Sequence, residues 1–274
     1  MLFNLDEYAD ISRVIREPEY AQSKHLLVKK CKSTWLQFLE QQLRELSVKD
    51  EHFHTHMARI KIDMAEEKKK DHALYLIKYD KQYITQNNVY TLGQFRSVIV
   101  DHEKVVCFSP PKAISYTYFR DMYDGGADNG VKALEFVEGT MINVFYDTRE
   151  KLWEIATRGN IGGHYKYYQD HSKTFRTMFL EAADNSHMDF PNTLDKQYCY
   201  SFVLQHPENR IVVSFTNTKL VLTNMYKCNK YKVEALPYEA ICTFARSITG
   251  IELPQFMRQL VPYDYYNLSN FRTV

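Results

Sequence analysis

Signals that mark metal-binding, secreted and membrane proteins are missing from this sequence. None of the five cysteines forms a CxxC pair, which argues against a zinc ribbon and a disulfide framework and favours a reducing compartment. The N-terminal segment contains early acidic side chains and lacks the apolar stretch of a secretion signal. No apolar run approaches the roughly 18 residues of a membrane-spanning helix. We therefore expect an intracellular protein with no membrane partner.

The common phosphate-binding loops and a chain-wide basic charge are absent as well. Neither GxGxxG nor GxxxxGK[ST] occurs, which argues against Rossmann and P-loop nucleotide sites. Lys and Arg number 35 against 34 Asp and Glu, so the formal net charge is only +1. Any nucleic-acid surface must therefore be a local patch. There is no HExxH pattern either, and His52, His54 and His56 would point to different faces of a helix, which favours surface histidines over a metal site.

What the chain does contain is enough apolar material for one large or two small domains. Its 274 residues are 45% hydrophobic and 25% charged, the composition of an ordinary globular protein. Tyrosine is abundant, at 21 residues, and it can serve cores, interfaces and base-stacking surfaces alike. Composition alone therefore predicts a packed fold but no particular activity.

The N-terminal third of the chain, residues 1–90, reads as mostly helical. Apolar residues recur at helical spacing from His25 to Leu46. A second helical pattern runs from about Phe53 to Tyr79 and includes a charge run typical of a solvated face. We expect a helical N-terminal region here.

From about Val89 the hydrophobic period changes to two. Phe95 to Asp101 and Lys104 to Phe108 predict a pair of strands around a short polar turn. We place a domain boundary near residue 90, with an α+β domain over 91–274. In that domain the strands are expected to pair antiparallel, because the order is not a βαβ alternation.

The segment from Leu134 to Gly163 predicts the central hairpin of this domain. An alternating run continues through Asp147, a polar turn follows at Thr148–Lys151, and a second run ends in glycines. Beyond the hairpin, apolar spacing predicts helices at about 172–183 and 237–250, and strands between them.

Three motifs follow one another along roughly residues 90–215. They are FRSVIV with VVCFSPPK, starting at Phe95 and Val105; EFVEGTM with ATRGN, starting at Glu135 and Ala156; and FVLQHPENRIV, starting at Phe202. Together they resemble the nucleotidyltransferase domain of ATP-dependent RNA ligases of the phage RNA ligase 1 type. The same domain plan is shared with DNA ligases and mRNA capping enzymes. Similar proteins occur in large DNA viruses, which suggests a viral source and the cytoplasm of an infected host cell.

This resemblance implies a covalent chemistry and a set of ligands. In the family a lysine attacks the α-phosphate of ATP, the AMP passes to an RNA 5′-phosphate, and a 3′-hydroxyl then displaces it. ATP and Mg²⁺ would be the cofactors, and RNA ends the partners. The nucleotide-binding residues implied by resemblance are Arg96, Lys112, Glu135, Glu138, Gly139, Arg158 and Arg210. Two alternatives stay open: Glu138-Gly139 could be an ordinary bulged hairpin position, and Arg210 could merely pair with a carboxylate.

The motif departs from the family at its most important position. Phe136 stands where the nucleophilic lysine should be, and phenylalanine cannot form a bond to phosphorus. Lys132 shares a strand face with Phe136 but lies about 13 Å back, at about 3.3 Å per residue, so it could substitute only if the strand bends.

Later family motifs are missing too. The strand before Pro207 carries no carboxylate, and no second Glu-Gly strand follows it. We expect a chain that is truncated, split or reduced, with a separate chain as one source of the missing motifs.

Three functions therefore stay open on the sequence alone. The first is an RNA ligase that uses ATP, impaired or inactive as a single chain. The second is a catalytically inactive module that binds nucleotide or RNA through the same fold. The third is a structural or interaction protein that reuses the fold, in which Phe136 would fill the nucleotide pocket.

Overall fold

Two antiparallel sheets form the body of the protein. The fold is taken from a computed structural model, which describes residues 1–254 apart from 33, 47–53, 68–72, 124–133, 167–172 and 210–212. A seven-stranded sheet, here called sheet A, and a four-stranded sheet, sheet B, account for the strands of this part of the chain. The mixed composition of helices and antiparallel strands confirms the predicted α+β class at that level.

Sheet A has the strand order β1-β11-β10-β9-β6-β7-β8. Its strands are β1 (Leu2–Asn4), β6 (Thr140–Asp147), β7 (Leu152–Thr157), β8 (Asn160–Ile161), β9 (Tyr198–Gln205), β10 (Lys219–Asn229) and β11 (Lys232–Ala235). The predicted hairpin is present as β6 and β7, which pair from Asp147↔Leu152 to Ile142↔Thr157. Strand β6 lies between β7 and β9, so the hairpin forms part of the sheet interior.

Sheet B has the order β2-β3-β4-β5. Its strands are β2 (Leu26–Cys31), β3 (Leu74–Tyr79), β4 (Val98–Val100) and β5 (Val105–Phe108). The predicted strand pair is confirmed as β4 and β5. Strand β3 pairs with β4, so sheet B contains segments from both sides of residue 90. The domain boundary near residue 90 stays a prediction. Strands on both sides of it pair in one sheet.

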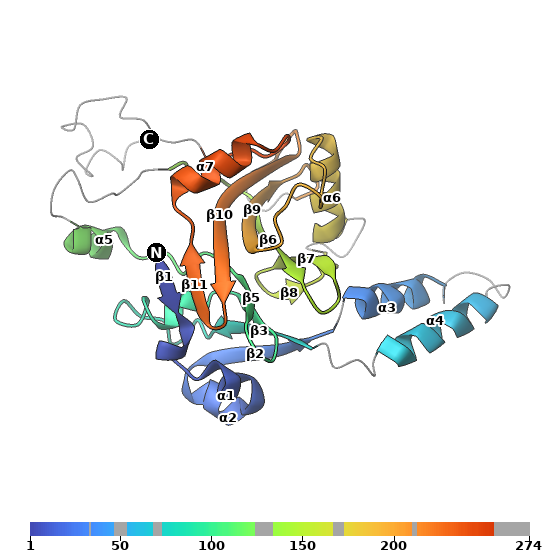
Figure 1. The fold of residues 1–274 in the computed structure, drawn as a ribbon, viewed down its shortest axis with the longest axis horizontal. Coiled ribbons are helices and arrows are strands. Elements are labelled where there is room, and N and C mark those ends of the chain that lie inside the picture. The colour runs from blue at the N-terminus through green and yellow to red at the C-terminus, as the bar shows by residue number, and fades with distance from the viewer. Residues whose placement is uncertain are drawn as a thin grey trace.

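The helices surround the sheets (Figure 1). They are α1 (Ile11–Arg16), α2 (Pro18–Ser23), α3 (Thr34–Leu46), α4 (His54–Glu67), α5 (Tyr116–Tyr123), α6 (Phe175–Asn185) and α7 (Tyr238–Arg246), with 3-10 turns η1 (Leu5–Glu7) and η3 (Leu92–Gln94). Helices α6 and α7 match the two helices predicted after the hairpin, and both pack on sheet A. Helices α3 and α4 extend together from one side of the body. No helix in the described ranges is long and apolar enough to cross a bilayer.

The prediction of a mostly helical N-terminal region is wrong for two segments, which are β2 and β3. Leu27 and Cys31 are four residues apart, the spacing of a helix face, but Leu27 is 50% exposed whereas Cys31 is buried. The two segments pair with each other over their full length, from Leu26↔Tyr79 to Cys31↔Leu74. Pairing of distant segments therefore overrides a short helical pattern.

Alternation along β6 divides its side chains between two apolar cores. Ile142 and Val144 pack with α6 and α7 on one face of sheet A. Phe145 faces the opposite way and joins the core that contains the strands of sheet B. Sheet A is thus covered on both faces, with helices on one side and sheet B on the other.

Candidate functional site

A tight approach of the chain to β9 fixes the loop that leads into β6. Gly139 has φ +144°, a backbone conformation that L side chains rarely adopt. A Cβ there would lie 2.6 Å from the carbonyl oxygen of Leu204 and 2.7 Å from Cγ1 of Val203. The next residue back, Glu138, accepts a hydrogen bond on its carbonyl oxygen from Nε2 of Gln205 at 2.9 Å. The Glu-Gly pair of the motif therefore has a definite structural reason in this chain.

Residues on either side of Gly139 differ in what they contact. On its C-terminal side, the Thr140 hydroxyl accepts a hydrogen bond from Nδ2 of the buried Asn209 at 2.9 Å, which ties the loop to the end of β9. On its N-terminal side, Glu135 and Phe136 are exposed, and the Phe136 side chain is 92% exposed. The ring at the lysine position thus points to solvent and fills no pocket.

Arg158 lies in the turn that joins β7 to β8. Its guanidinium carbon is 5.5 Å from the centroid of the Tyr79 ring, in a cation–π arrangement at the end of β3. Its Nε is buried and has no hydrogen-bond partner among the described residues. An unpartnered buried donor on a charged group is unfavourable, and an anionic ligand would satisfy it.

Three lysines lie close to Arg158 or to each other beside it: Lys29 and Lys78 belong to sheet B, and Lys81 follows β3. Lys78 comes from β3, and its Nζ is 3.8 Å from the position that a Cβ would take at Gly159. Lys29 of β2 donates a hydrogen bond from Nζ to Oδ1 of Asn160 at 3.3 Å. We call Lys29, Lys78, Lys81 and Arg158 the basic cluster.

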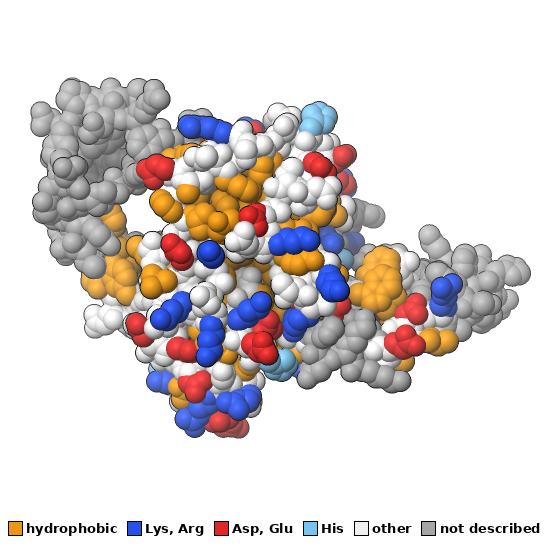
Figure 2. Space-filling view, viewed as in Figure 1, with side chains coloured by type: hydrophobic (Ala, Val, Ile, Leu, Met, Phe, Trp, Pro, Cys, Tyr) orange, Lys and Arg blue, Asp and Glu red, His pale blue; other side chains and the backbone are white. Residues whose placement is uncertain are grey.

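The electrostatics of the basic cluster centre on Lys78. Burial lowers the pKa of Lys78, and the charges of Arg158, Lys29 and Lys81 lower it further. Within the described part of the chain, none of the four cations forms an ion pair with a carboxylate within 4.0 Å. The cluster is therefore a local concentration of positive charge that no carboxylate of the described residues pairs with. On the face in Figure 2, basic and acidic side chains are interspersed.

Arg96 and Lys112 lie at the same end of sheet B as the basic cluster. The Tyr79 amide donates a hydrogen bond to the carbonyl of Phe95, the residue before Arg96, at 2.6 Å. The Lys112 amide donates to the carbonyl of Gly93 at 2.9 Å. The side chain of Lys112 is exposed. Arg96 is close enough to Tyr226 of sheet A to oppose slightly the rise in tyrosine pKa that burial causes.

The predicted site residues are thus brought together only in part. Arg158 stacks on Tyr79 at the end of β3, and the backbone next to Arg96 and that of Lys112 lie at the neighbouring ends of β4 and β5. Glu138 and Gly139 are held against β9. Lys132 and Arg210 lie outside the described residues.

Sequence reasoning missed Lys29, Lys78 and Lys81, because their segments were assigned to helices or left unassigned. The signal that could have found the first two is their position on paired strands: Lys29 and Lys78 share one face of sheet B with buried Cys31 and Leu76.

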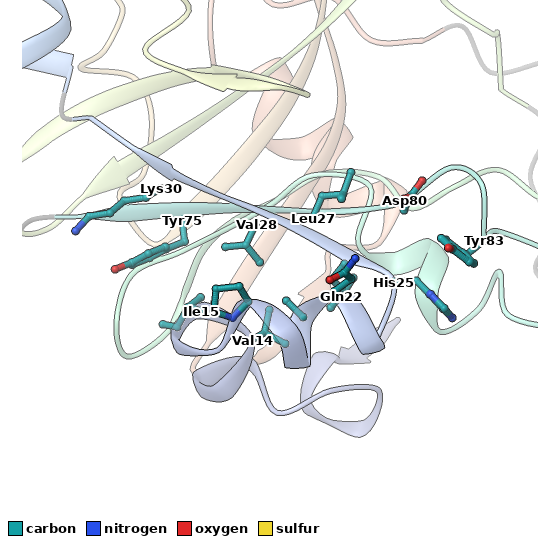
Figure 3. Close-up of a pocket in the computed structure, with 13 residues that line it drawn as sticks. Val14, Ile15, Gln22, His25, Leu27, Val28, Lys30, Tyr75, Asp80 and Tyr83 are labelled. Atoms are coloured by element: carbon teal, nitrogen blue, oxygen red, sulfur yellow. The ribbon is translucent and has the colours of Figure 1, made fainter.

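A pocket of about 450 Å³ lies elsewhere, between helices α1 and α2 and sheet B (Figure 3). His25 and Tyr83 stack at one end, with ring centroids 4.0 Å apart, and Lys30 lies at the other end. Val28 and Lys30, which line the pocket, alternate with Lys29 and so lie on the opposite face of β2 from it, while Leu27 at the start of the strand also lines the pocket. Among the residues that line this pocket, Lys30 is the single lysine and there is no arginine. The pocket therefore does not offer the group of cations that a triphosphate needs.

The resemblance implies two ligands, the phosphates of ATP and Mg²⁺, and the described side chains suit the first better than the second. The unneutralised cations and the unpartnered Nε of Arg158 fit a phosphate group. For a divalent metal, the described ranges contain no group of three or more His, Cys, Asp or Glu side chains that could hold one. His52 and the side chains of His54 and His56 lie outside the described residues. The basic cluster is therefore suited to an anionic group such as phosphate.

Comparison with known proteins gives one informative match. No protein-family model matches the chain. The RNA ligase of Rhodothermus phage RM378 is 27% identical to it over 154 residues, covering 52% of this chain and 34% of the phage protein. The match therefore spans about a third of that relative. This similarity supports an RNA ligase-like relationship.

Proposed function

We propose that this chain is a nucleotidyltransferase-type, RNA ligase-like domain that binds the phosphates of ATP and of RNA ends at the basic cluster. The observation that carries the proposal is Arg158, a guanidinium with a buried and unpartnered Nε. It lies near Lys78, whose neighbours Lys29 and Lys81 are also cations, and none of these groups pairs with a carboxylate in the part of the chain that the structure describes. The distant phage RNA ligase supports the class of substrate.

The chemistry of the cluster favours phosphate over other anions. A guanidinium presents a planar fork of donors that matches two oxygens of a phosphate, and stacking on Tyr79 limits the rotation of that fork. Lys29 and Lys81 are exposed, so they can reach a chain of phosphates that extends out of the site. ATP would supply the activated α-phosphate, and the cations would offset the negative charge that develops on phosphate oxygens.

Ligand-induced stabilisation tests this proposal. The melting temperature of the full chain would be measured with increasing ATP, and separately with a 5′-phosphorylated RNA oligonucleotide. Arg158→Ala should weaken binding by about tenfold or more, because a charge-assisted hydrogen bond is worth roughly 1.5–3 kcal/mol. Arg246→Ala is the matched control, since Arg246 is an exposed arginine on α7. Equal stabilisation of the two variants by either ligand would contradict the assignment of Arg158.

A second candidate function is a module that binds nucleotide or RNA ends without joining them. The observation that favours it is Phe136, which offers no amine at the expected lysine position and lies 92% exposed. The scaffold alternative loses its specific support, because the Phe136 ring does not fill a pocket. If this chain binds both ligands but does not join RNA, a separate chain carrying the later motifs becomes part of the proposal.

A further inference from the structure

We propose that Cys199 of β9 and Cys228 of β10 form an oxidisable thiol pair, which hydrogen peroxide converts into a disulfide bridge between the two strands. Their sulfur atoms lie 3.9 Å apart, within hydrogen-bond distance for sulfur. Neither cysteine belongs to the basic cluster, so this chemistry is independent of the phosphate binding proposed above.

The register of β9 and β10 makes the two cysteines neighbours. Cys199 pairs with Tyr226, and Cys228 follows Tyr226 by two residues, so alternation puts all three side chains on one face of sheet A. A disulfide holds its sulfurs about 2.05 Å apart, so the pair must close by roughly 2 Å. Cys228 is the second-last residue of β10, next to the turn into β11, and a small shift of that strand end can supply the movement.

Cys107 of β5 completes a group of three sulfurs where the two sheets meet. Its thiol hydrogen-bonds with Cys199, and the amide of the following residue, Phe108, donates to the Cys199 sulfur at 3.4 Å. Cys199 therefore contacts sheet B on one side and Cys228, within sheet A, on the other. This group is not a metal centre, because no set of three His, Cys, Asp or Glu side chains in the described ranges could hold an ion.

Hydrogen bonds within this group favour loss of the proton from Cys199. Burial raises the pKa of the Cys199 thiol, but hydrogen bonds from the Cys107 and Cys228 thiols and from the Phe108 amide outweigh burial and lower it. The contact with Cys199, together with burial, raises the pKa of Cys228. Because the thiolate is the attacking form, Cys199 is the better nucleophile of the pair toward an oxidised Cys228.

Exposure decides which sulfur meets the oxidant first. Cys228 is half-buried and lies between the exposed residues Lys227 and Asn229, whereas Cys199 is only 2% exposed. Lys104 is near enough for its charge to oppose the rise in the pKa of Cys228. Reactive cysteines combine partial exposure with a neighbouring cation, so a small peroxide should oxidise Cys228 before Cys199.

The oxidation balances with hydrogen peroxide as its co-reactant. The Cys228 sulfur attacks one peroxide oxygen, the O–O bond breaks, and the departing oxygen takes the thiol proton and leaves as water. The Cys199 sulfur then attacks the sulfur of the Cys228 sulfenic acid, and the S–O bond breaks. The hydroxide that leaves takes up the proton of the Cys199 thiol to form a second water. Both electrons that the thiols lose go to peroxide, and a reducing thiol of the cell reverses the bridge.

Peptide mapping of the oxidised full-length chain tests the proposal. Protein treated with hydrogen peroxide would be alkylated, digested without reductant and examined by mass spectrometry. We expect a cross-linked peptide that joins Cys199 to Cys228 and disappears on treatment with dithiothreitol. Cys242→Ser is the matched control, because Cys242 is half-buried like Cys228 but lies on α7, and this variant should form the bridge as the native chain does.

Variants of the pair separate the roles of its two sulfurs. In Cys199→Ser the sulfenic acid on Cys228 should persist, so its labelling by dimedone should rise several-fold over the native chain. In Cys228→Ser we expect Cys199 to stay reduced, since the oxidant no longer has a partly exposed sulfur to attack. A bridge from Cys199 to Cys107, or oxidation of Cys31, Cys242 or Cys228 with no Cys199–Cys228 bridge, would overturn the proposal. So would a native chain whose cysteines all stay reduced in peroxide.

Discussion

Gly139 and Phe136 stand three residues apart in one loop, yet the structure constrains them very differently. Gly139 has a positive φ and no room for a Cβ, because the backbone of β9 lies directly against it. Phe136 is 92% exposed. Packing against β9 therefore explains the glycine of the motif. The phenylalanine side chain is not part of either core.

Substitution of these two residues should affect stability very unequally. Gly139→Ala should lower the free energy of unfolding by about 2 kcal/mol or more, through backbone strain and displacement of β9. Phe136→Ala should change it by no more than roughly 0.5 kcal/mol. Chemical denaturation monitored by circular dichroism measures both. A loss of stability in Phe136→Ala as large as that in Gly139→Ala would show that the Phe136 ring is packed.

Strand β7 contains a buried carboxyl group, Glu154, that its hydrophobic pattern does not reveal. Glu154 is buried, and burial raises its pKa to about 7, although a hydrogen bond from the Thr34 hydroxyl and the charge of Arg176 act in the opposite direction. Thr34 begins α3, so this carboxyl joins β7 to the base of the α3–α4 pair. The residue pattern predicted β7 as a strand but gave no sign of this link.

Burial of Glu154 should make the stability of the protein depend on pH. Below about pH 4.5 the carboxyl is protonated in both the folded and the unfolded chain. As the pH rises toward 7 the unfolded chain loses the proton first, so the free energy of unfolding should fall by up to roughly 3 kcal/mol and then level off. Denaturant titrations of Glu154→Gln at several pH values should lack this fall. A parallel pH dependence in the variant and the native chain would show that Glu154 is not its source.

Elements that depend on local sequence could be predicted, and those that depend on distant pairing could not. The hairpin β6–β7 and helices α6 and α7 follow from alternation and helical spacing within one segment. Strands β2 and β3 pair across more than forty residues, from Cys31 to Leu74, and their short apolar patterns also fit a helix. This is why a region with two strands of sheet B was predicted to be helical.

At the scale of the whole molecule, the candidate site is made by the packing of one sheet against the other. Lys29 and Lys78 come from sheet B, whereas Arg158 comes from the β7–β8 turn of sheet A. The motif that includes Arg158 could be read from the sequence, but Lys29 and Lys78 lie 80 and more residues earlier in the chain. Their meeting depends on the assembly of the two sheets, which no local pattern encodes.

The dissociation constant of ATP for Arg158→Gln, measured by calorimetry beside the native chain, is the most direct test of the basic cluster as a phosphate site. Glutamine keeps much of the side-chain volume and removes the charge. We predict that ATP binds the variant about tenfold more weakly or worse, with no loss of folded protein. A dissociation constant equal to that of the native chain would contradict the assignment of the basic cluster to phosphate.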